Sequence, residues 1–256
     1  MSIPILAALA LFPAMAGAWW LQRRSMNAGW VDVVWTFSLG LAGVVAVLAT
    51  GEGARAWLVA ALVAAWALRL GLYILGRTRG GPEDARYNHF RREWGAAFQQ
   101  RMFGFLMIQA AAAALLMLPM VLAAASPRPL GWPDALAVLV LVVAVVGEGV
   151  ADAQLGRFRA NPANHGKVCD AGLWAWSRHP NYFFEWLHWL AYPLFALGAD
   201  YGWLALLGPA FMYWLLVHVS GIPPLEAQML RSRGEAYAAY QRRVSAFLPL
   251  PSGTTP

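Results

Sequence analysis

The sequence predicts an all-α polytopic membrane protein with seven transmembrane helices and a cytoplasmic C-terminal amphipathic helix. The chain of 256 residues is 60% hydrophobic and only 12% charged, whereas soluble domains contain about 25% charged residues. Its apolar stretches are long enough to cross a bilayer, which takes roughly 20 residues. No alternation of polar and apolar residues indicates a barrel, so the spans are expected to be helices.

Seven apolar segments meet this length requirement. They are approximately residues 3–22, 28–49, 56–76, 102–125, 133–155, 181–199 and 202–220. We interpret the first as a retained span and not a signal peptide, because it lacks a charged leading region and a clear small-residue cleavage site. With no long linker, repeat or low-complexity segment, residues 1–256 are expected to form a single membrane domain.

The net charge of +6 is unevenly distributed between the loops. Arg55 and Arg128 lie on one side of the predicted spans, and Arg69 lies inside one. All the other Lys and Arg residues lie on the opposite side. These are Arg23, Arg24, Arg77, Arg79, Arg86, Arg91, Arg92, Arg101, Arg157, Arg159, Lys167, Arg178, Arg231, Arg233, Arg242 and Arg243. By the positive-inside rule that side is cytoplasmic and the N-terminus is outside.

The first acid inside a span is Asp32, which follows Trp30 and precedes Trp35 in the second segment. A carboxylate in lipid is costly and by default marks a functional site. Two interpretations stay open for Asp32: a helix-entry residue near the membrane interface, or a carboxylate in a binding pocket.

The third span and the loop after it carry two further polar groups. Arg69, Tyr73 and Arg77 follow one another at i, i+4 spacing, so they form one stripe on an apolar helix. Snorkelling to the interface explains Arg77, but Arg69 lies two turns deeper, which favours a functional face. The loop predicts a short amphipathic helix that contacts lipid headgroups, and in it Arg86 and Tyr87 are candidate ligand contacts. Its apolar side is expected to comprise Tyr87, Phe90, Trp94 and Phe98.

The fifth and sixth spans bring acids into the apolar region. Glu148, Asp152 and Arg159 share one face of the fifth span, either as a functional group or as a self-satisfied ion pair. A Gly-x-Gly-x-x-Asp pattern overlaps this face, but no strand precedes it, so it is not a dinucleotide fingerprint. The sixth span follows an Arg-His-Pro sequence that is typical of a helix start. Asn181 and Glu185 then share one face, with Glu185 about one turn inside the membrane.

These polar residues belong to the cytoplasmic halves or ends of the predicted helices. We therefore expect a cavity in a helix bundle, open to the cytoplasm and covered by the basic third and fifth loops. A large cofactor with phosphates suits the Arg and Lys rim. Asn and carboxylate side chains suit amides, ribose hydroxyls or an adenine amino group, and the lipid-facing half suits an apolar substrate.

The sequence lacks the motifs that are typical of metal sites and of catalytic nucleophiles. The five His are scattered without an HExxH spacing, and the single Cys169 excludes a disulfide framework and a Cys-cluster metal site. No GxSxG elbow or Walker loop is present. Nucleic acid is not an expected partner, because the basic residues lie in loops beside membrane spans.

The sequence Gly172-Leu-Trp-x-x-Ser-Arg-His-Pro-Asn-Tyr-Phe-x-Glu185, the Gly-Lys-Val-Cys-Asp-x-Gly before it and the segment from Glu226 to Pro249 resemble the steroid 5-alpha-reductase family in its bacterial branch. The resemblance implies a seven-helix fold in a bacterial inner membrane that binds NADPH in its cytoplasmic half. It implies reduction of the Δ4 double bond of 3-oxo-Δ4-steroids or similar apolar enones. Hydride passes to the β-carbon, while acidic side chains polarise the carbonyl. We expect a monomer surrounded by membrane lipids.

The resemblance also implies site residues. Asn181 and Glu185 match contacts of the nicotinamide end, Asp152 and Arg159 match contacts of the adenosine and phosphates, and Lys167 matches a basic residue of the fifth loop. The candidate cofactor-binding residues are Arg69, Tyr73, Arg77, Arg86, Tyr87, Asp152, Arg159, Asn164, Lys167, Arg178, His179, Asn181, Tyr182, Glu185 and Glu226.

The candidate catalytic residues are Asp32, Trp66 and Tyr73. Asp32 falls where the family has a Glu, one methylene longer, and Trp66 falls where it has a Tyr. An indole N–H donates a hydrogen bond but does not act as an acid, so Tyr73 or a water would supply the proton.

Two alternative functions remain from the sequence. Isoprenylcysteine carboxyl methyltransferases share the Arg-His-Pro-x-Tyr turn and bind S-adenosylmethionine. The Asn-Tyr-Phe-x-Glu continuation and the basic residues Arg69, Arg159 and Lys167 favour a phosphate-bearing cofactor instead. A transporter or receptor is disfavoured, because the outer loops are short and apolar.

Overall fold

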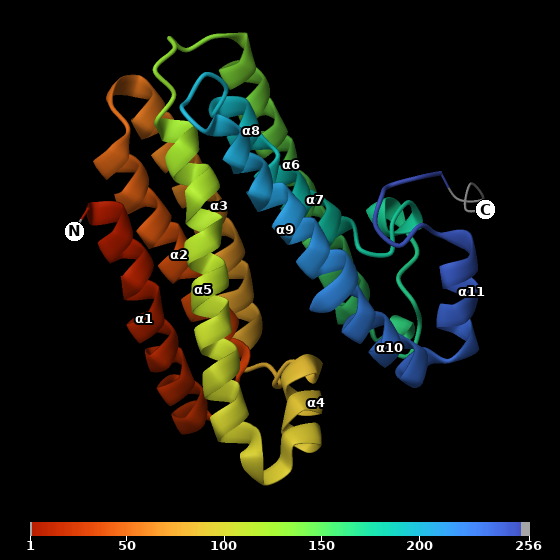
Figure 1. The fold of residues 1–256 in the computed structure, drawn as a ribbon. Coiled ribbons are helices and arrows are strands. Elements are labelled where there is room, and N and C mark those ends of the chain that lie inside the picture. Colours follow the sequence, from red (N-terminus) through yellow and green to blue (C-terminus); the bar gives the residue numbers. More distant parts are fainter. Residues whose placement is uncertain (1, 252–256) are drawn as a thin grey trace. The chain divides into compact units, whose positions relative to one another are not determined.

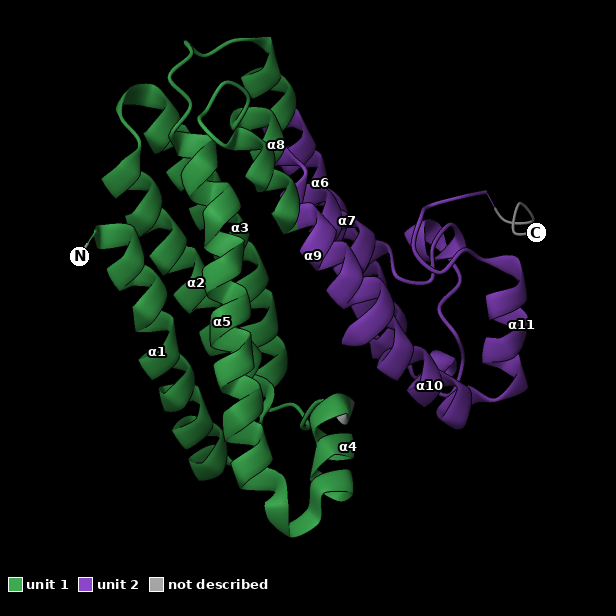
Figure 2. Cartoon of the chain, viewed as in Figure 1, with its two compact units in different colours: residues 1–137, 192–208 green, residues 138–191, 209–256 purple. Residues whose placement is uncertain are grey.

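The computed structural model describes residues 2–251, and within them nearly all regular structure is helical (Figure 1). The chain forms two compact units (Figure 2). Unit 1 comprises Met1–Ala137 and Tyr192–Gly208, and unit 2 comprises Val138–Ala191 and Pro209–Pro256. The boundaries between the units fall inside helices, so the chain passes from one unit to the other without a linker.

The helices of unit 1 are α1 (Ile3–Ser25), α2 (Gly29–Thr50), α3 (Gly53–Thr78), α4 (Ala85–Trp94) and α5 (Phe98–Ala124), with the 3-10 turns η1 (Gly95–Ala97) and η4 (Gly202–Leu206). Three helices contain residues of both units: α6 (Trp132–Ala160), α8 (Ala191–Phe195) and α9 (Leu207–Trp214). Unit 2 adds α7 (Pro180–Trp189), α10 (Ile222–Arg233) and α11 (Glu235–Arg243), the π-helix η5 (Leu215–Val219), and the 3-10 turns η2 (Pro162–Asn164) and η3 (Gly172–Ala175).

Six helical stretches in the described residues are long and apolar enough to span a bilayer, which indicates an integral membrane protein. They are Ile3–Ser25, Gly29–Thr50, Gly53–Thr78, Arg86–Ala124, Trp132–Ala160 and Gly202–Arg233. The prediction of seven spans is therefore not confirmed. The missing one is 181–199, which is divided at Leu190 into α7 and the short α8. Pro193 has no N–H to donate to the carbonyl four residues earlier, and this explains the interruption.

The long helices of unit 1 lie side by side, and α2 packs against α1, α3 and α5 (Figure 1). The contact between α2 and α3 is close at Gly40, where an added Cβ would lie 2.2 Å from Cβ of Ala67. Leu41 and Ile108 are each 69% exposed on the outside of this bundle. Exposed apolar side chains of this kind are compatible with lipid contact.

The predicted amphipathic helix after the third span is confirmed as α4. The rings of Phe90 and Trp94 stack with centroids 4.6 Å apart, and Tyr87 and Phe98 pack at the two ends of this pair. The four aromatic residues thus pack in one continuous row, but only Tyr87, Phe90 and Trp94 belong to α4, because the helix ends at Trp94 and Phe98 is the first residue of α5.

In unit 2, α6 and α7 approach closely at Gly147, where an added Cβ would lie 2.4 Å from the Phe184 ring. The indole of Trp186 joins α7 to α9 by donating to the Pro209 carbonyl at 3.0 Å. The expected C-terminal amphipathic helix is two helices, α10 and α11, which meet at Gly234 with φ of 54°. The structure does not confirm its cytoplasmic placement.

A π-helical turn, η5, precedes α10. The N–H of Ser220 donates to the carbonyl of Leu215, five residues earlier, at 2.8 Å. Such turns are single-residue insertions into an α-helix, and this one is followed by a break at Gly221, where φ is −92° and ψ is −91°, before α10 begins.

Candidate functional site

In unit 1 the candidate residues gather around Asp32 in the first turn of α2. Its carboxylate accepts hydrogen bonds from the Arg86 guanidinium at 2.7 Å and the Tyr87 hydroxyl at 2.8 Å. The Arg86 guanidinium also lies over the Tyr87 ring, 4.6 Å from its centroid. Asp32 thus joins α2 to α4, and Tyr87 is fully buried. This cluster combines a carboxylate with two hydrogen-bond donors.

The polar stripe of α3 divides into a half-buried and an exposed part. The Arg69 guanidinium lies 5.7 Å from the centroid of the Tyr73 ring, so the i, i+4 contact exists. Arg77 is 47% exposed and pairs with Asp84 at 3.4 Å. Trp66, the candidate indole donor, is fully buried on the same helix.

In unit 2, three carboxylates are buried on α6 and α7. Glu148, Asp152 and Glu185 are 5%, 4% and 7% exposed. The Asn181 amide donates to Asp152 at 3.4 Å, and the Trp189 indole donates to Glu185 at 3.2 Å. The predicted polar faces of the two helices therefore meet.

The register of α6 and α7 extends this face. Gly147 lies against Phe184 and Asp152 against Asn181, so the two helices run antiparallel. The same register places Glu148 and Glu185 at one level of the pair. The face thus presents several buried carboxylate oxygens, each of which accepts more than one hydrogen bond, and so it suits a ligand with hydroxyl and amide N–H donors.

The residues around Glu226 form a second cluster in unit 2. The Arg178 guanidinium donates to both oxygens of the Glu226 carboxylate, at 2.6 and 3.2 Å. It also donates to the carbonyls of Gln241 and Val244 at 3.0 and 2.5 Å. Arg178 therefore joins the start of α7 to α10 and to the end of α11, a structural role that its motif did not indicate.

His179 belongs to the same cluster. Its Nε2 lies 3.1 Å from the Glu226 carboxylate, and its ring stacks on Tyr182 at 5.5 Å with an interplanar angle of 13°. Because Nε2 faces a carboxylate, we assign it the proton. Arg178, His179 and Glu226 are thus brought together in one cluster, and their role as cofactor contacts stays a prediction.

Burial lowers the pKa of His179 from its ordinary value of 6.5, although the Glu226 carboxylate opposes this shift. The unfolded chain therefore binds a proton at a higher pH than the folded protein. Stability is expected to fall as pH drops below about 6.5, by up to about 1.4 kcal/mol per pH unit. The apparent melting temperature in detergent, measured from about pH 7.5 to about pH 5.5, across the ordinary pKa of histidine, checks this.

A matched pair of variants isolates the contribution of His179. His179→Gln should flatten the decline of melting temperature at low pH, since the titrating group is gone. His165→Gln, in the exposed part of the fifth loop, should leave the decline unchanged. Equal slopes for all three proteins would contradict the assignment.

The fifth loop carries the remaining candidates. Arg159 and Lys167 are exposed, and the Asn164 amide donates to the Phe158 carbonyl at 3.0 Å. Cys169 is buried, and this burial raises the pKa of its thiol. The two basic side chains are therefore accessible to phosphates, whereas the thiol is not a reactive group.

Residues 2–251 contain no group of three or more His, Cys, Asp or Glu side chains arranged to hold a metal ion. The apolar spans and the buried acids Glu148 and Asp152 on α6 define the class of protein. The described chain is a helical integral membrane protein with carboxylates buried on a membrane helix. It belongs to the DUF1295 family, whose model, described as a protein of unknown function, matches residues 18–244. No curated protein and no solved structure matches the chain.

Proposed function

We propose that the protein is an NADPH-dependent reductase of an apolar enone, such as a 3-oxo-Δ4-steroid, in a bacterial inner membrane. The DUF1295 family is associated with steroid 5-alpha-reductase-like proteins. The motif residues from Gly172 to Glu185 lie inside the matched region. The positive-inside rule supports a cofactor site on the cytoplasmic side.

The observation that carries this proposal is the buried acidic face of α6 and α7. Asp152, Asn181 and Glu185 offer acceptors for ribose hydroxyls, an adenine amino group or a carboxamide. The exposed Arg159 and Lys167 of the same unit supply positive charge for phosphates. The residues present therefore fit a phosphorylated dinucleotide.

When bound, NADPH would supply the hydride for the β-carbon of the enone, and a proton from Tyr73 or a water would complete the reduction at the α-carbon. The chain must then orient the dinucleotide, exclude water and stabilise negative charge on the carbonyl oxygen. We assign orientation to Asn181 and Glu185, whose positions on α7 are fixed by packing. We assign charge stabilisation to the cluster of Asp32, Arg86 and Tyr87, in which the guanidinium is the donor to the substrate, while Asp32, which also accepts from the Tyr87 hydroxyl, orients it.

Ligand-dependent thermal stability tests the cofactor. NADPH should raise the melting temperature of the purified protein, because a ligand that binds only the folded state stabilises it. S-adenosylmethionine should have no such effect. Stabilisation by S-adenosylmethionine alone would overturn the proposal in favour of a methyltransferase.

Glu185→Gln tests the site with little change in side-chain volume. We expect it to weaken NADPH binding about tenfold, the loss of one charged hydrogen bond. Glu235→Gln is the control, because Glu235 is an exposed acid of the same unit. Unchanged NADPH affinity in Glu185→Gln, with an unchanged melting temperature of the ligand-free protein, would remove Glu185 from the site.

A further inference from the structure

The two arginines that the sequence places on the outer side converge on one carboxylate. Arg55 in α3 pairs with Asp134 in α6. Arg128 also pairs with Asp134, at 2.6 and 3.1 Å. Arg55 and Asp134 are each 4% exposed in their side chains. Two guanidinium groups thus share one acid, which leaves this buried cluster with one excess positive charge.

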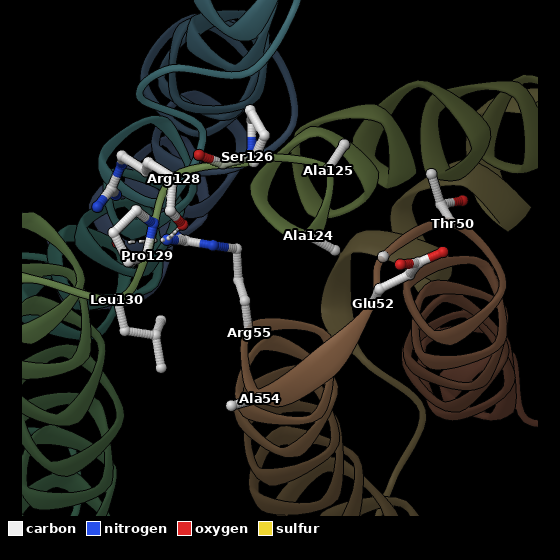
Figure 3. A pocket seen from close by; sticks show the side chains of 12 residues that line it. Thr50, Glu52, Ala54, Arg55, Ala124, Ala125, Ser126, Arg128, Pro129 and Leu130 are labelled. Atoms are coloured by element: carbon white, nitrogen blue, oxygen red, sulfur yellow. Dashed lines mark hydrogen bonds between the residues drawn. The ribbon is translucent and has the colours of Figure 1, made fainter.

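The cluster forms part of the wall of a cavity of about 680 Å³ in unit 1. The cavity lies between the α2–α3 turn and the α5–α6 loop, and its lining includes Thr50, Glu52, Arg55, Ser126, Arg128 and Leu130. Figure 3 shows Arg55 and Arg128 on one side and Glu52 and Thr50 on the other. The cavity therefore has a cationic side that faces an anionic one.

One donor in this wall is unused. Nε of Arg55 is buried and has no hydrogen-bond partner among the described residues. Its two Nη atoms donate to Asp134 and to the carbonyls of Arg128, Pro129 and Phe195. A buried donor without an acceptor is unfavourable, and an oxyanion in the cavity would satisfy it.

Exposed aromatic residues mark this end of unit 1 as a membrane interface. Trp57, Trp132, Tyr201 and Trp203 are 68%, 75%, 72% and 68% exposed. Trp and Tyr are enriched at the level of lipid headgroups. The cavity beside them therefore lies at headgroup level, at the end of the unit opposite to Asp32 and α4.

We propose that this cavity binds the headgroup of a phospholipid that carries both a phosphate and a primary ammonium, as phosphatidylethanolamine does. The phosphate interacts with Arg55 Nε and Arg128, and the ammonium with Glu52. A volume of about 680 Å³ suits a small-molecule site. A purely anionic headgroup leaves Glu52 without a partner, and a quaternary ammonium has no N–H to donate to it. The site does not depend on the proposed reductase activity.

Thermal unfolding of the full chain in detergent tests the site, with added short-chain phosphatidylethanolamine, phosphatidylcholine, phosphatidylglycerol or soluble phosphoethanolamine. The phosphatidylethanolamine is expected to raise the melting temperature, with an apparent affinity about tenfold above that of the other two lipids. Soluble phosphoethanolamine should bind at least about tenfold more weakly than the lipid, since it lacks the acyl chains. An equal response to all three lipids would overturn the headgroup assignment, and an equal response to the soluble compound would overturn a lipid ligand.

Two variants at exposed positions localise the effect. Glu52→Gln should reduce the preference for phosphatidylethanolamine about tenfold, and Ala54→Trp should abolish its effect by filling the cavity. Asp200→Asn, an exposed acid of the same unit outside the cavity lining, should behave as the unaltered protein. All three should keep the lipid-free melting temperature. A full lipid response in Ala54→Trp would show that the lipid binds elsewhere.

Discussion

Replacing Arg178 with Met is expected to lower the free energy of unfolding by about 3–5 kcal/mol, because it leaves the Glu226 carboxylate without its main charged partner. The side chain of Arg178 is only 10% exposed. Its loss also removes donors from the carbonyls of Gln241 and Val244. The measurement is the melting temperature together with the rate of tryptic cleavage in α10 and α11.

Arg242→Met is the matched control for this experiment. Arg242 pairs with Glu235 at 2.5 Å, but the two side chains are 64% and 79% exposed. Exposed pairs contribute about 0–1 kcal/mol. Equal destabilisation by the two variants would show that Arg178 does not hold the C-terminal helices. Glu226→Gln should resemble Arg178→Met in direction, with a smaller effect, because an amide oxygen still accepts from the guanidinium.

Asp32→Ala is expected to reduce kcat/KM for enone reduction at least about a hundredfold. The substitution removes the carboxylate that fixes the Tyr87 hydroxyl and the Arg86 guanidinium. NADPH affinity should change little, because the proposed cofactor contacts belong to α6 and α7. Steady-state kinetics with an enone substrate and a separate NADPH titration distinguish the two effects.

The companion variants are Tyr87→Phe and Glu93→Gln. Tyr87→Phe keeps the buried ring and removes only the hydroxyl, so a loss of activity without a loss of NADPH binding would assign the effect to that donor. Glu93 is an exposed acid of α4, 56% exposed, and Glu93→Gln should leave the kinetics unchanged. Full activity in Asp32→Ala would show that Asp32 takes no part in the reaction and serves only to anchor α4.

Hydropathy and spacing predicted most of the helices, because a run of apolar residues leaves a membrane segment few alternatives to a helix. They also predicted the row of aromatic residues along α4 and the polar faces of α6 and α7, which meet at Asp152 and Asn181. They did not predict the division of 181–199. One proline hardly changes the mean hydropathy of the segment, whereas at Pro193 the helix loses a backbone N–H donor.

The candidate site shows the same division between local and long-range information. The contact of Arg69 with Tyr73 is set by helical spacing, and the sequence predicts it. The pairing of Asp32 with Arg86 and Tyr87 joins segments far apart in the chain, and no periodicity contains it. An acid at the start of one helix and an Arg-Tyr pair in a loop on the same membrane side were the only available signal.

The π-helical turn at Leu215–Val219 and the break at Gly221 together set the direction in which α10 leaves the last long helical stretch. One residue corresponds to about 100° of rotation around a helix axis. Removing one residue from this junction would therefore move Glu226 away from the direction in which it meets Arg178. The junction acts as a fixed angle between the membrane part of the stretch and its polar end. In an alignment of relatives, the family should tolerate substitutions in this turn more readily than a single-residue deletion.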